Sequence, residues 1–134
     1  MQVQPYLHFD GRCEEAIEFY RHALNVEVTM MSRFKDSPDP TMIAPGTENK
    51  IMHMEFRLGD LILCASDGRC MGNAQFDGIS LTLNLKTIAE AERIFAALSE
   101  GGQVQMPMIE AFFALRFGMV ADRFGVPWMI IVRK

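Results

Sequence analysis

Three charged or polar side chains at alternate positions could carry out acid–base chemistry. His53, Glu55 and Arg57 follow one another at steps of two residues. Residues two apart in a strand point to the same face, so we expect these three side chains to share one face. A histidine beside a carboxylate can take up and release a proton near neutral pH. We interpret His53 and Glu55 as a candidate acid–base pair, with Arg57 orienting a polar ligand.

Each of these side chains also has an ordinary structural interpretation. His53 could be a half-buried strand histidine that forms a hydrogen bond with a neighbour. Glu55 and Arg57 could pair with each other or face solvent. The sequence leaves both interpretations open.

A second polar set lies in the run ISLTLNL. Ser80, Thr82 and Asn84 alternate there with four aliphatic residues, Ile79, Leu81, Leu83 and Leu85. The pattern predicts a strand whose apolar face packs on a helix. We expect its polar face, and that of the strand with His53, to line a cavity.

The C-terminal part of the chain holds aromatic residues near one carboxylate, Glu110. Phe112 and Phe113 could form an apolar pocket with Glu110 as its polar anchor, although core packing would explain them equally well. Alternation does not decide which of the two phenylalanines faces the cavity. Trp128 alternates with Ile130 and Val132, so we predict that these three hold the last strand to a helix and that Met129 and Ile131 face the cavity.

The remaining histidines and the cysteines have weaker claims to chemistry. His8 is out of phase with Pro5 and Leu7, so we predict that it does not share their cavity-facing side, and His22 is predicted on the outer face of a helix. The three cysteines, Cys13, Cys64 and Cys70, are odd in number and form no C-x-x-C pair. Reduced thiols in a cytoplasmic protein explain them most simply, with Cys70 in a Gly-rich loop the most exposed.

The elements that must position these residues follow the same order twice. We predict a strand over 2–9, a helix that Asp10 caps and Asn25 ends, a strand over 26–34, a loop over 35–50, and a hairpin over 50–66 with its turn at Gly59-Asp60. In the second half we predict a strand over 79–85, a helix from Thr87 to Gly101-Gly102 with a Thr87–Glu90 capping box, a strand within 103–115, and two short strands around a turn at 122–125.

The two helices can be superposed at an offset of about 75 residues, since Glu15-Ala16 then meets Glu90-Ala91. We therefore predict an α+β fold of two tandem strand–helix–three-strand modules that form a curled mixed sheet around a cavity. The chain is expected to be one domain, 1–134, with module one at about 1–66, a linker at 67–77 and module two at about 78–134.

Composition excludes several classes of protein. The 134 residues are 49% hydrophobic and 22% charged, with a net charge of −4, and no basic run occurs. This composition is that of a globular domain without nucleic-acid or anionic-membrane partners. No apolar stretch is long enough to span a bilayer and no signal peptide is evident, so we expect a cytoplasmic protein.

Three stretches carry a resemblance to a known family: PYLHFDGRCEEAIEFY, HMEFRLGD and EAFFALRFGMVADRFGVPWMI. Together they resemble the PhnB-like branch of the vicinal oxygen chelate superfamily, which includes glyoxalase I, extradiol dioxygenases, fosfomycin-resistance proteins and bleomycin-binding proteins. The resemblance implies a glyoxalase-like fold, a small-molecule ligand and a homodimer, in some members with exchanged modules. Some proteins of the branch carry a demethylubiquinone methyltransferase name, but this chain has no Gly-rich strand-to-helix loop for S-adenosylmethionine.

Metal enzymes of the superfamily hold a divalent ion on four side chains, and the resemblance places these positions at Pro5, His53, Gly78 and Met129. Proline and glycine offer no side-chain donor and a thioether is a soft ligand, so only His53 is of a suitable type. We therefore predict no cofactor and a small-molecule-binding protein, in which His53 and Glu55 could also act as the acid and base of a lyase or isomerase.

Two other hypotheses remain. One is a divalent-metal lyase, isomerase or dioxygenase that uses a different ligand set, His53 with Glu55 or Glu110, with the ion weakly held. The other is a purely structural interaction protein.

Overall fold

The computed structural model describes the backbone of residues 1–134 and every side chain except that of Met42. The chain divides into two compact units, residues 1–74 and 75–134. The first contains β1 (Tyr6–His8), α1 (Cys13–Leu24), β2 (Glu27–Arg33), two short 3₁₀ turns (Phe34–Asp36 and Pro40–Met42), β3 (Ile51–Leu58) and β4 (Leu61–Ser66). The second contains β5 (Leu81–Leu85), α2 (Ile88–Ser99), β6 (Gln103–Ala111), β7 (Ala114–Ala121) and β8 (Pro127–Arg133).

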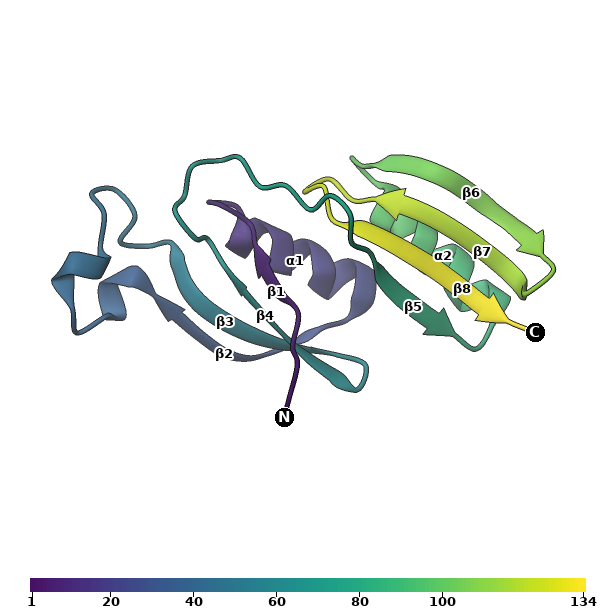
Figure 1. The fold of residues 1–134 in the computed structure, drawn as a ribbon, viewed down its shortest axis with the longest axis horizontal. Helices are drawn as coiled ribbons and strands as arrows, with labels where there is room; N and C mark the ends of the chain where they lie inside the picture. The colour runs from purple at the N-terminus through teal and green to yellow at the C-terminus, as the bar shows by residue number, and fades with distance from the viewer. The chain divides into compact units, whose positions relative to one another are not determined.

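Each unit is one helix and one four-stranded mixed sheet, and the two sheets have the same topology (Figure 1). Their strand orders are β1-β4-β3-β2 and β5-β8-β7-β6. The first strand of each unit pairs parallel with the last, whereas the other pairs are antiparallel. The predicted α+β fold of two tandem strand–helix–three-strand modules is therefore confirmed.

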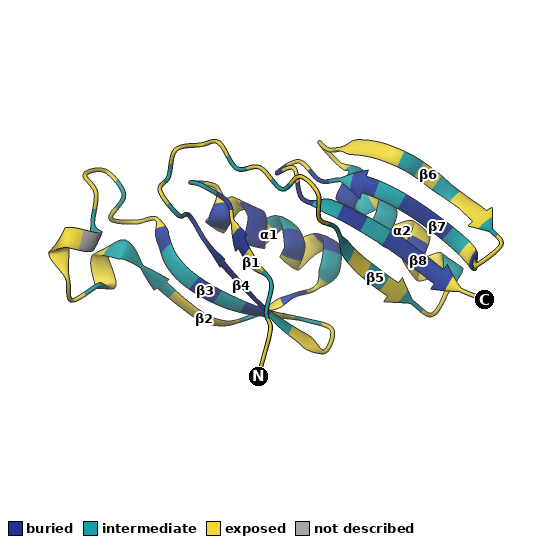
Figure 2. Ribbon diagram, viewed as in Figure 1, coloured by how far each residue is buried: buried dark blue, intermediate teal, exposed yellow. Residues whose placement is uncertain are grey.

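The alternating pattern decides which face of the first sheet meets α1. The apolar residues at alternate positions of these strands are buried: Leu7 and Phe9, Met54 and Phe56, and Leu63 and Ala65. Figure 2 colours buried residues dark blue. The Phe9 ring lies 6.1 Å from that of Tyr20 in α1, so this apolar set is the helix-facing side of the sheet. Burying each large apolar side chain stabilises the unit by about 1.5–3 kcal/mol.

The second sheet follows the same rule. Trp128, Ile130 and Val132 are buried, as the alternation predicted. Gly118 pairs with Ile130, and a Cβ atom at Gly118 would approach the Phe95 ring of α2, which places this side of the sheet against the helix. β5 is shorter than predicted because the strand starts at Leu81, and Ile79 is 62% exposed before it.

Local signals predicted most boundaries correctly. Asn25 ends α1 in the left-handed conformation, and the Thr87 hydroxyl accepts a hydrogen bond from the N–H of Glu90 at the start of α2. β1 is shorter than predicted, and the loop over 35–50 contains the two 3₁₀ turns. No helix in the part of the chain that the structure describes is long and apolar enough to cross a membrane.

The prediction that Asp10 caps α1 is wrong. Asp10 lies in the turn before the helix, and its carboxylate accepts hydrogen bonds from the N–H groups of Met71 (2.8 Å) and Asn73 (2.9 Å). These two hydrogen bonds lower the pKa of Asp10. Asp10 therefore fixes the segment that follows β4 against the β1–α1 turn.

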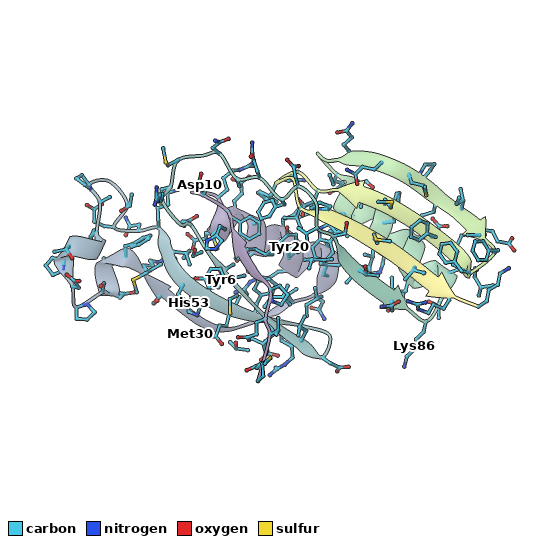
Figure 3. The ribbon with its side chains drawn as sticks, viewed as in Figure 1. Tyr6, Asp10, Tyr20, Met30, His53 and Lys86 are labelled. Carbon is cyan, nitrogen blue, oxygen red and sulfur yellow. The ribbon has the colours of Figure 1, made fainter. Side chains whose placement is uncertain are left out.

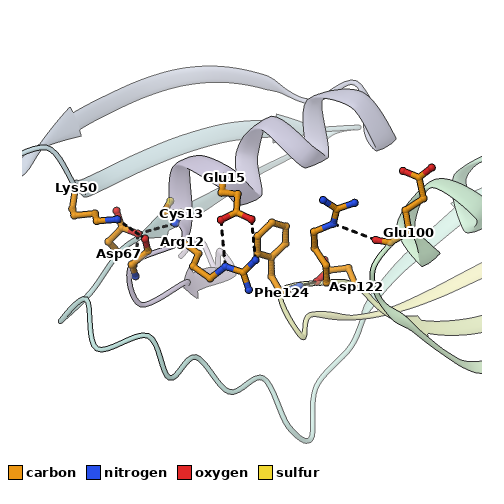
Figure 4. Close-up of polar contacts among 10 residues, drawn as sticks. Arg12, Cys13, Glu15, Lys50, Asp67, Glu100, Asp122 and Phe124 are labelled. Carbon is orange, nitrogen blue, oxygen red and sulfur yellow. Dashed lines mark hydrogen bonds and ion pairs between the residues drawn. The ribbon is translucent and has the colours of Figure 1, made fainter.

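The buried carboxylate of Asp67, just after β4, organises the start of α1 instead (Figure 4). Its Oδ1 accepts hydrogen bonds from the N–H groups of Gly11 (3.1 Å) and Cys13 (2.7 Å), and its Oδ2 accepts one from the N–H of Ile51 (2.6 Å). The N–H groups of a helix's first turn have no partner within the helix, so an acceptor there stabilises it. Asp67 thus joins the start of α1, the start of β3 and the end of β4.

Asp122 plays a comparable part in the second unit. Its Oδ1 accepts from the N–H groups of Phe124 (2.8 Å) and Val126 (3.0 Å), and its Oδ2 accepts from the indole N–H of Trp128 (2.9 Å). The predicted turn at 122–125 is confirmed by the hydrogen bond from the N–H of Gly125 to the carbonyl of Asp122. This carboxylate fixes the turn and the start of β8 together.

The replacement Asp67→Asn should lower the free energy of unfolding by about 2–4 kcal/mol, because an amide can accept on one side only and leaves a buried N–H unpaired. Urea denaturation measures the change. The matched control is Asp60→Asn in the exposed turn between β3 and β4, where we expect a change within about 0.5 kcal/mol. Equal effects of the two replacements would contradict the role of Asp67.

Candidate functional site

The side of the first sheet that faces away from α1 carries polar side chains. They belong to the strand residues that alternate with the buried ones. We call this side the polar face and define it by residues of β1, β3 and β4: Tyr6, His8, His53, Glu55, Cys64 and Ser66. Strand pairing places them in two rows. His8 lies beside Ser66, while Tyr6 lies beside Cys64 and Cys64 beside Glu55.

His53 has a hydrogen-bond partner on each side. Figure 3 labels His53 and one of these partners, Tyr6, in the first unit. Its Nδ1 lies 2.9 Å from the Tyr6 hydroxyl, and its Nε2 lies 3.1 Å from Oε2 of Glu55. The side chain of His53 is 28% exposed and that of Glu55 35%, so the pair is only partly shielded from solvent. The predicted sharing of a face by His53 and Glu55 thus becomes a direct contact.

The partners decide which ring nitrogen carries the proton. An ionised carboxylate can only accept, so Nε2 of His53 donates to Glu55. In the neutral imidazole Nδ1 is then the acceptor, and the Tyr6 hydroxyl donates to it. The result is a chain of hydrogen bonds from Tyr6 through His53 to Glu55.

The prediction that His8 lies off this face is wrong. The aligned position Pro5 suggested that Leu7 faces the cavity, but Leu7 is buried on the α1 side of the sheet. Tyr6 and His8 therefore point to the polar face, where their rings stack at 4.7 Å. Nδ1 of His8 also lies 3.5 Å from the Ser66 hydroxyl.

Arg57 lies at the edge of this arrangement. It pairs with Glu27 on the neighbouring β2 at 3.2 Å rather than with Glu55, and both side chains are at least half exposed. Exposed pairs of this kind contribute about 0–1 kcal/mol to stability. Arg57 is therefore free of any strong structural commitment.

The corresponding side of the second sheet is mostly apolar. Ala114, Phe117 and Ile131 form a buried cluster on which three methionines pack, namely Met106, Met119 and Met129. Thr82 pairs with Met129 and Asn84 with Ile131 across β5 and β8, so these predicted site residues share this side, while Ser80 precedes β5. The Asn84 amide oxygen accepts a hydrogen bond from Nε of Arg133 at 3.1 Å.

The aromatic pair predicted near Glu110 lies in the turn between β6 and β7. Phe113 packs against Phe117, with ring centroids 5.3 Å apart, whereas Phe112 is 91% exposed. Glu110 is also exposed and lies 3.8 Å from the Lys134 ammonium. Phe113 therefore joins the methionine-lined cluster, and neither Glu110 nor Phe112 does.

The four positions that correspond to metal ligands do not fit a divalent ion. Only His53 among them has a hard or borderline donor, and both of its nitrogens already have partners. Among the residues whose side chains are described, no three histidine, cysteine or acidic side chains lie close enough together to hold a metal ion.

A cleft of about 360 Å³ lies elsewhere, at the start of α1. Its charged groups serve the fold: Asp67 binds three N–H groups, the Lys50 ammonium donates to the carbonyl of Gly11, and Glu14 pairs with Arg33. The charged side chains of this cleft therefore stabilise the start of α1 around Asp67.

The cysteines are free thiols of different accessibility. Burial raises the pKa of Cys13, and the nearby Asp67 and Glu14 raise it further. Burial also raises the pKa of Cys64, with a contribution from Glu55, and that of Cys70. Cys70 is the only one of the three that is not fully buried, which confirms the predicted order of exposure.

Comparison with known proteins gives a consistent result over the full chain. The family model described as 3-demethylubiquinone-9 3-methyltransferase matches residues 1–131. Protein YjdN of Escherichia coli K12 is 34% identical over 142 aligned residues, which cover 100% of this chain and 97% of the relative.

Solved structures of similar proteins also match over nearly the whole chain. Protein PA1353 of Pseudomonas aeruginosa is 42% identical with a TM-score of 0.87, covering 99% of this chain and 98% of its own. The putative 3-demethylubiquinone-9 3-methyltransferase, PhnB protein, of Bacillus cereus is 28% identical with a TM-score of 0.83, covering 98% and 99%. The fosfomycin resistance protein FosX of Mesorhizobium loti shares the fold at 9% identity, with a TM-score of 0.65 and coverage of 100% and 92%.

The thiols give a direct test of the site's geometry. With an aromatic disulfide reagent at neutral pH, we expect Cys70 to react first and more slowly than free cysteine, because its raised pKa leaves less thiolate. Cys13 and Cys64 should react only when the protein is unfolded. The control Cys70→Ser should remove the native-state reaction, and fast reaction of a second thiol in that variant would contradict the burial of Cys13 and Cys64.

Proposed function

Because the chain belongs to the 3-demethylubiquinone-9 3-methyltransferase family, with PhnB-like relatives and a glyoxalase-like fold, we propose that it binds a small molecule on the polar face of its first sheet. The ligand is held without the four-ligand metal site of metal-dependent enzymes with this fold. His53 and Glu55 act as its acid–base pair. The observation that carries the proposal is the placement of His53 between Tyr6 and Glu55, partly open to solvent.

Three features support this assignment. Both ring nitrogens of His53 have a hydrogen-bond partner, and its side chain stays 28% exposed, so it is oriented and still accessible. The carboxylate orients the imidazole and would stabilise its protonated form, as in acid–base sites generally. The Tyr6–His53 hydrogen bond joins β1 to β3, which both pair with β4, and the His53–Glu55 hydrogen bond lies within β3, so the sheet holds the three side chains in fixed positions.

The other predicted ligand-binding residues take secondary places in this proposal. Arg57 lies on β3 two residues beyond Glu55 and can turn toward a negatively charged part of a ligand. The second sheet carries a separate apolar surface of its own, with Met129, Phe113 and Thr82. We retain these residues as candidates because small-molecule sites are lined largely by apolar side chains.

We also propose that the chain forms a homodimer in the cytoplasm. The three free cysteines fit a reducing compartment. Val104 and Ile109 on the edge strand β6 are both 45% exposed, which provides apolar area for a partner.

The ligand proposal predicts a binding signal that depends on His53. In a screen of small metabolites, a ligand at 100 times its dissociation constant should stabilise the wild-type protein by about 2.7 kcal/mol, which corresponds to a rise of several degrees in melting temperature. His53→Ala should lose most of this rise. The matched control His22→Ala, on the exposed surface of α1, should retain it.

Elemental analysis of protein purified without chelators distinguishes the metal-dependent alternative. The proposal predicts no stoichiometric divalent ion and no thermal shift with nickel, zinc or manganese. A stoichiometric ion that is lost in His53→Ala would overturn the metal-free assignment.

The dimer predicts a solution mass near twice the 15.2 kDa of the chain. Size-exclusion chromatography with light scattering at micromolar concentration measures it. Ile109→Lys should move the protein toward the monomer, since a charge in an apolar interface is costly, whereas Val3→Lys at the exposed N-terminus should not. A mass near that of one chain for the wild type contradicts the dimer.

A further inference from the structure

We infer that Tyr6 is the residue of the polar face that meets the ligand, and that its hydroxyl takes a proton from an acidic hydroxyl group, a phenol or an enol. This inference rests on the proposed function and adds the ligand's chemical class and a third residue. Tyr6 passes its own proton to His53. Glu55 remains ionised and orients the imidazole.

The direction of the hydrogen bonds shows which side chain is the outer member of the chain from Tyr6 to Glu55. Nε2 of His53 donates its proton to Glu55, so the imidazole can accept a proton only at Nδ1. The group at Nδ1 is the Tyr6 hydroxyl. A ligand cannot reach Nδ1 of His53 without displacing Tyr6. The oxygen of Tyr6 is therefore the outer end of the chain of hydrogen bonds.

Tyr6 is also the member of this chain of hydrogen bonds that solvent reaches most easily. Tyr6 is exposed, whereas His53 and Glu55 are only partly exposed. Its ring is fixed on one side by stacking on His8, at 4.7 Å and 22°, and it lies 5.5 Å from the ring of His53. Tyr6 is thus both the most accessible member of the chain and one whose position is set by its neighbours.

The proposed proton transfer involves the ligand hydroxyl, the Tyr6 hydroxyl and Nδ1 of His53. The Tyr6 hydroxyl donates its proton to the hydrogen bond with His53. At the same time, the oxygen of this hydroxyl can accept a hydrogen bond from a ligand O–H. The ligand proton then moves to the Tyr6 oxygen as the Tyr6 proton moves to Nδ1 of His53. The products are a ligand oxyanion, a neutral Tyr6 whose O–H donates to that oxyanion, and an imidazolium that donates to Tyr6 and to Glu55. No bond other than O–H and N–H changes, and no oxidant or reductant is needed.

The class of ligand follows from this balance. An imidazole accepts protons near neutral pH, so it can ionise only a hydroxyl that is not much weaker as an acid. The pKa of a phenol is about five to six units lower than that of water, whereas the pKa of an aliphatic alcohol is close to that of water. The arrangement therefore selects phenols and enols over alcohols.

The surroundings permit this chemistry. The titratable groups that face the site are His8 and Tyr6 from β1, His53, Glu55 and Arg57 from β3, and Cys64 from β4, and Arg57 pairs with Glu27 of β2. Glu55 is the only carboxylate on the polar face itself among the described side chains, and it is bound to His53. A ligand oxyanion at Tyr6 would be held by the Tyr6 O–H, with His8 beside it.

A purely structural role for the Tyr6–His53 hydrogen bond is the competing explanation, because the bond joins β1 to β3 across β4. Stability measurements alone would not separate the two roles. The test therefore reads the ionisation state of a bound probe, which a structural crosslink does not change.

The probe is 4-nitrophenol, whose phenolate absorbs in the visible range, and 4-nitroanisole is the matched compound without a proton to give. Both are titrated with the full chain at a pH below the probe's own pKa, and circular dichroism confirms that each variant is folded. We expect the wild type to bind both compounds and to raise the ratio of phenolate to phenol about tenfold, the effect of one hydrogen bond to a charged group. Tyr6→Phe keeps the ring and its stacking, so it should bind both compounds within about threefold and lose the tenfold rise.

The other variants complete the comparison. His53→Gln should also lose the rise, because the proton acceptor is absent, and the exposed His22→Gln should behave as wild type. A Tyr6→Phe protein that ionises the probe as well as wild type would overturn the role of Tyr6. Binding of both compounds without ionisation in the wild type would overturn the proton transfer.

Failure of this inference and failure of the proposed function have different signatures. If neither probe binds to the wild type, the phenol or enol class is wrong, and the His53-dependent metabolite screen still decides whether the polar face binds a small molecule. If that screen also shows no His53-dependent ligand, the proposed function is wrong as well.

Discussion

The buried carboxylate of Asp67 is the constraint on which the first unit and its polar face depend. It binds the N–H of Ile51, and His53 lies two residues further along β3. It follows Ser66, which pairs with His8 in the parallel β1–β4 ladder. The three strands that carry Tyr6, His53 and Cys64 are thereby fixed relative to α1 at one point. Such a group must be fully satisfied to stabilise the fold, because an unpaired buried carboxylate is costly.

The two units use one topology for two kinds of surface. Both sheets put their apolar alternation against a helix, and both have one buried aspartate that gathers three donors. The opposite side differs: the first sheet presents hydrogen-bonding groups around His53, and the second presents methionines around Phe117 and Ile131. Methionine side chains are flexible and polarisable, so they adapt to irregular apolar shapes. The two units thus share one backbone topology, although the side chains on the face away from the helix are polar in the first unit and apolar in the second.

The contacts of His53 support the proposal that the site works without a metal. A catalytic metal site needs about three protein ligands and an open position. Here the single suitable side chain has a hydroxyl on one nitrogen and a carboxylate on the other. In the proposed function this histidine takes part in proton transfer, with its tautomer set by Glu55. Fold-level similarity alone would not reveal this difference, because function depends on the residues placed on the fold.

The sequence by itself determined the elements, their order, and the shared face of His53 and Glu55, because these features depend on short-range periodicity within one helix or strand. Trp128, Ile130 and Val132 were correctly assigned to the core for the same reason. The sequence did not identify Tyr6 and His8 as neighbours of His53, nor Asp67 as the cap of α1. Tyr6 and His53 are 47 residues apart, and Cys13 and Asp67 are 54 apart. Only the pairing of β1 with β4 and the burial of Leu7 decided which side of β1 faces His53, since a shift of one residue exchanges the two faces of a strand.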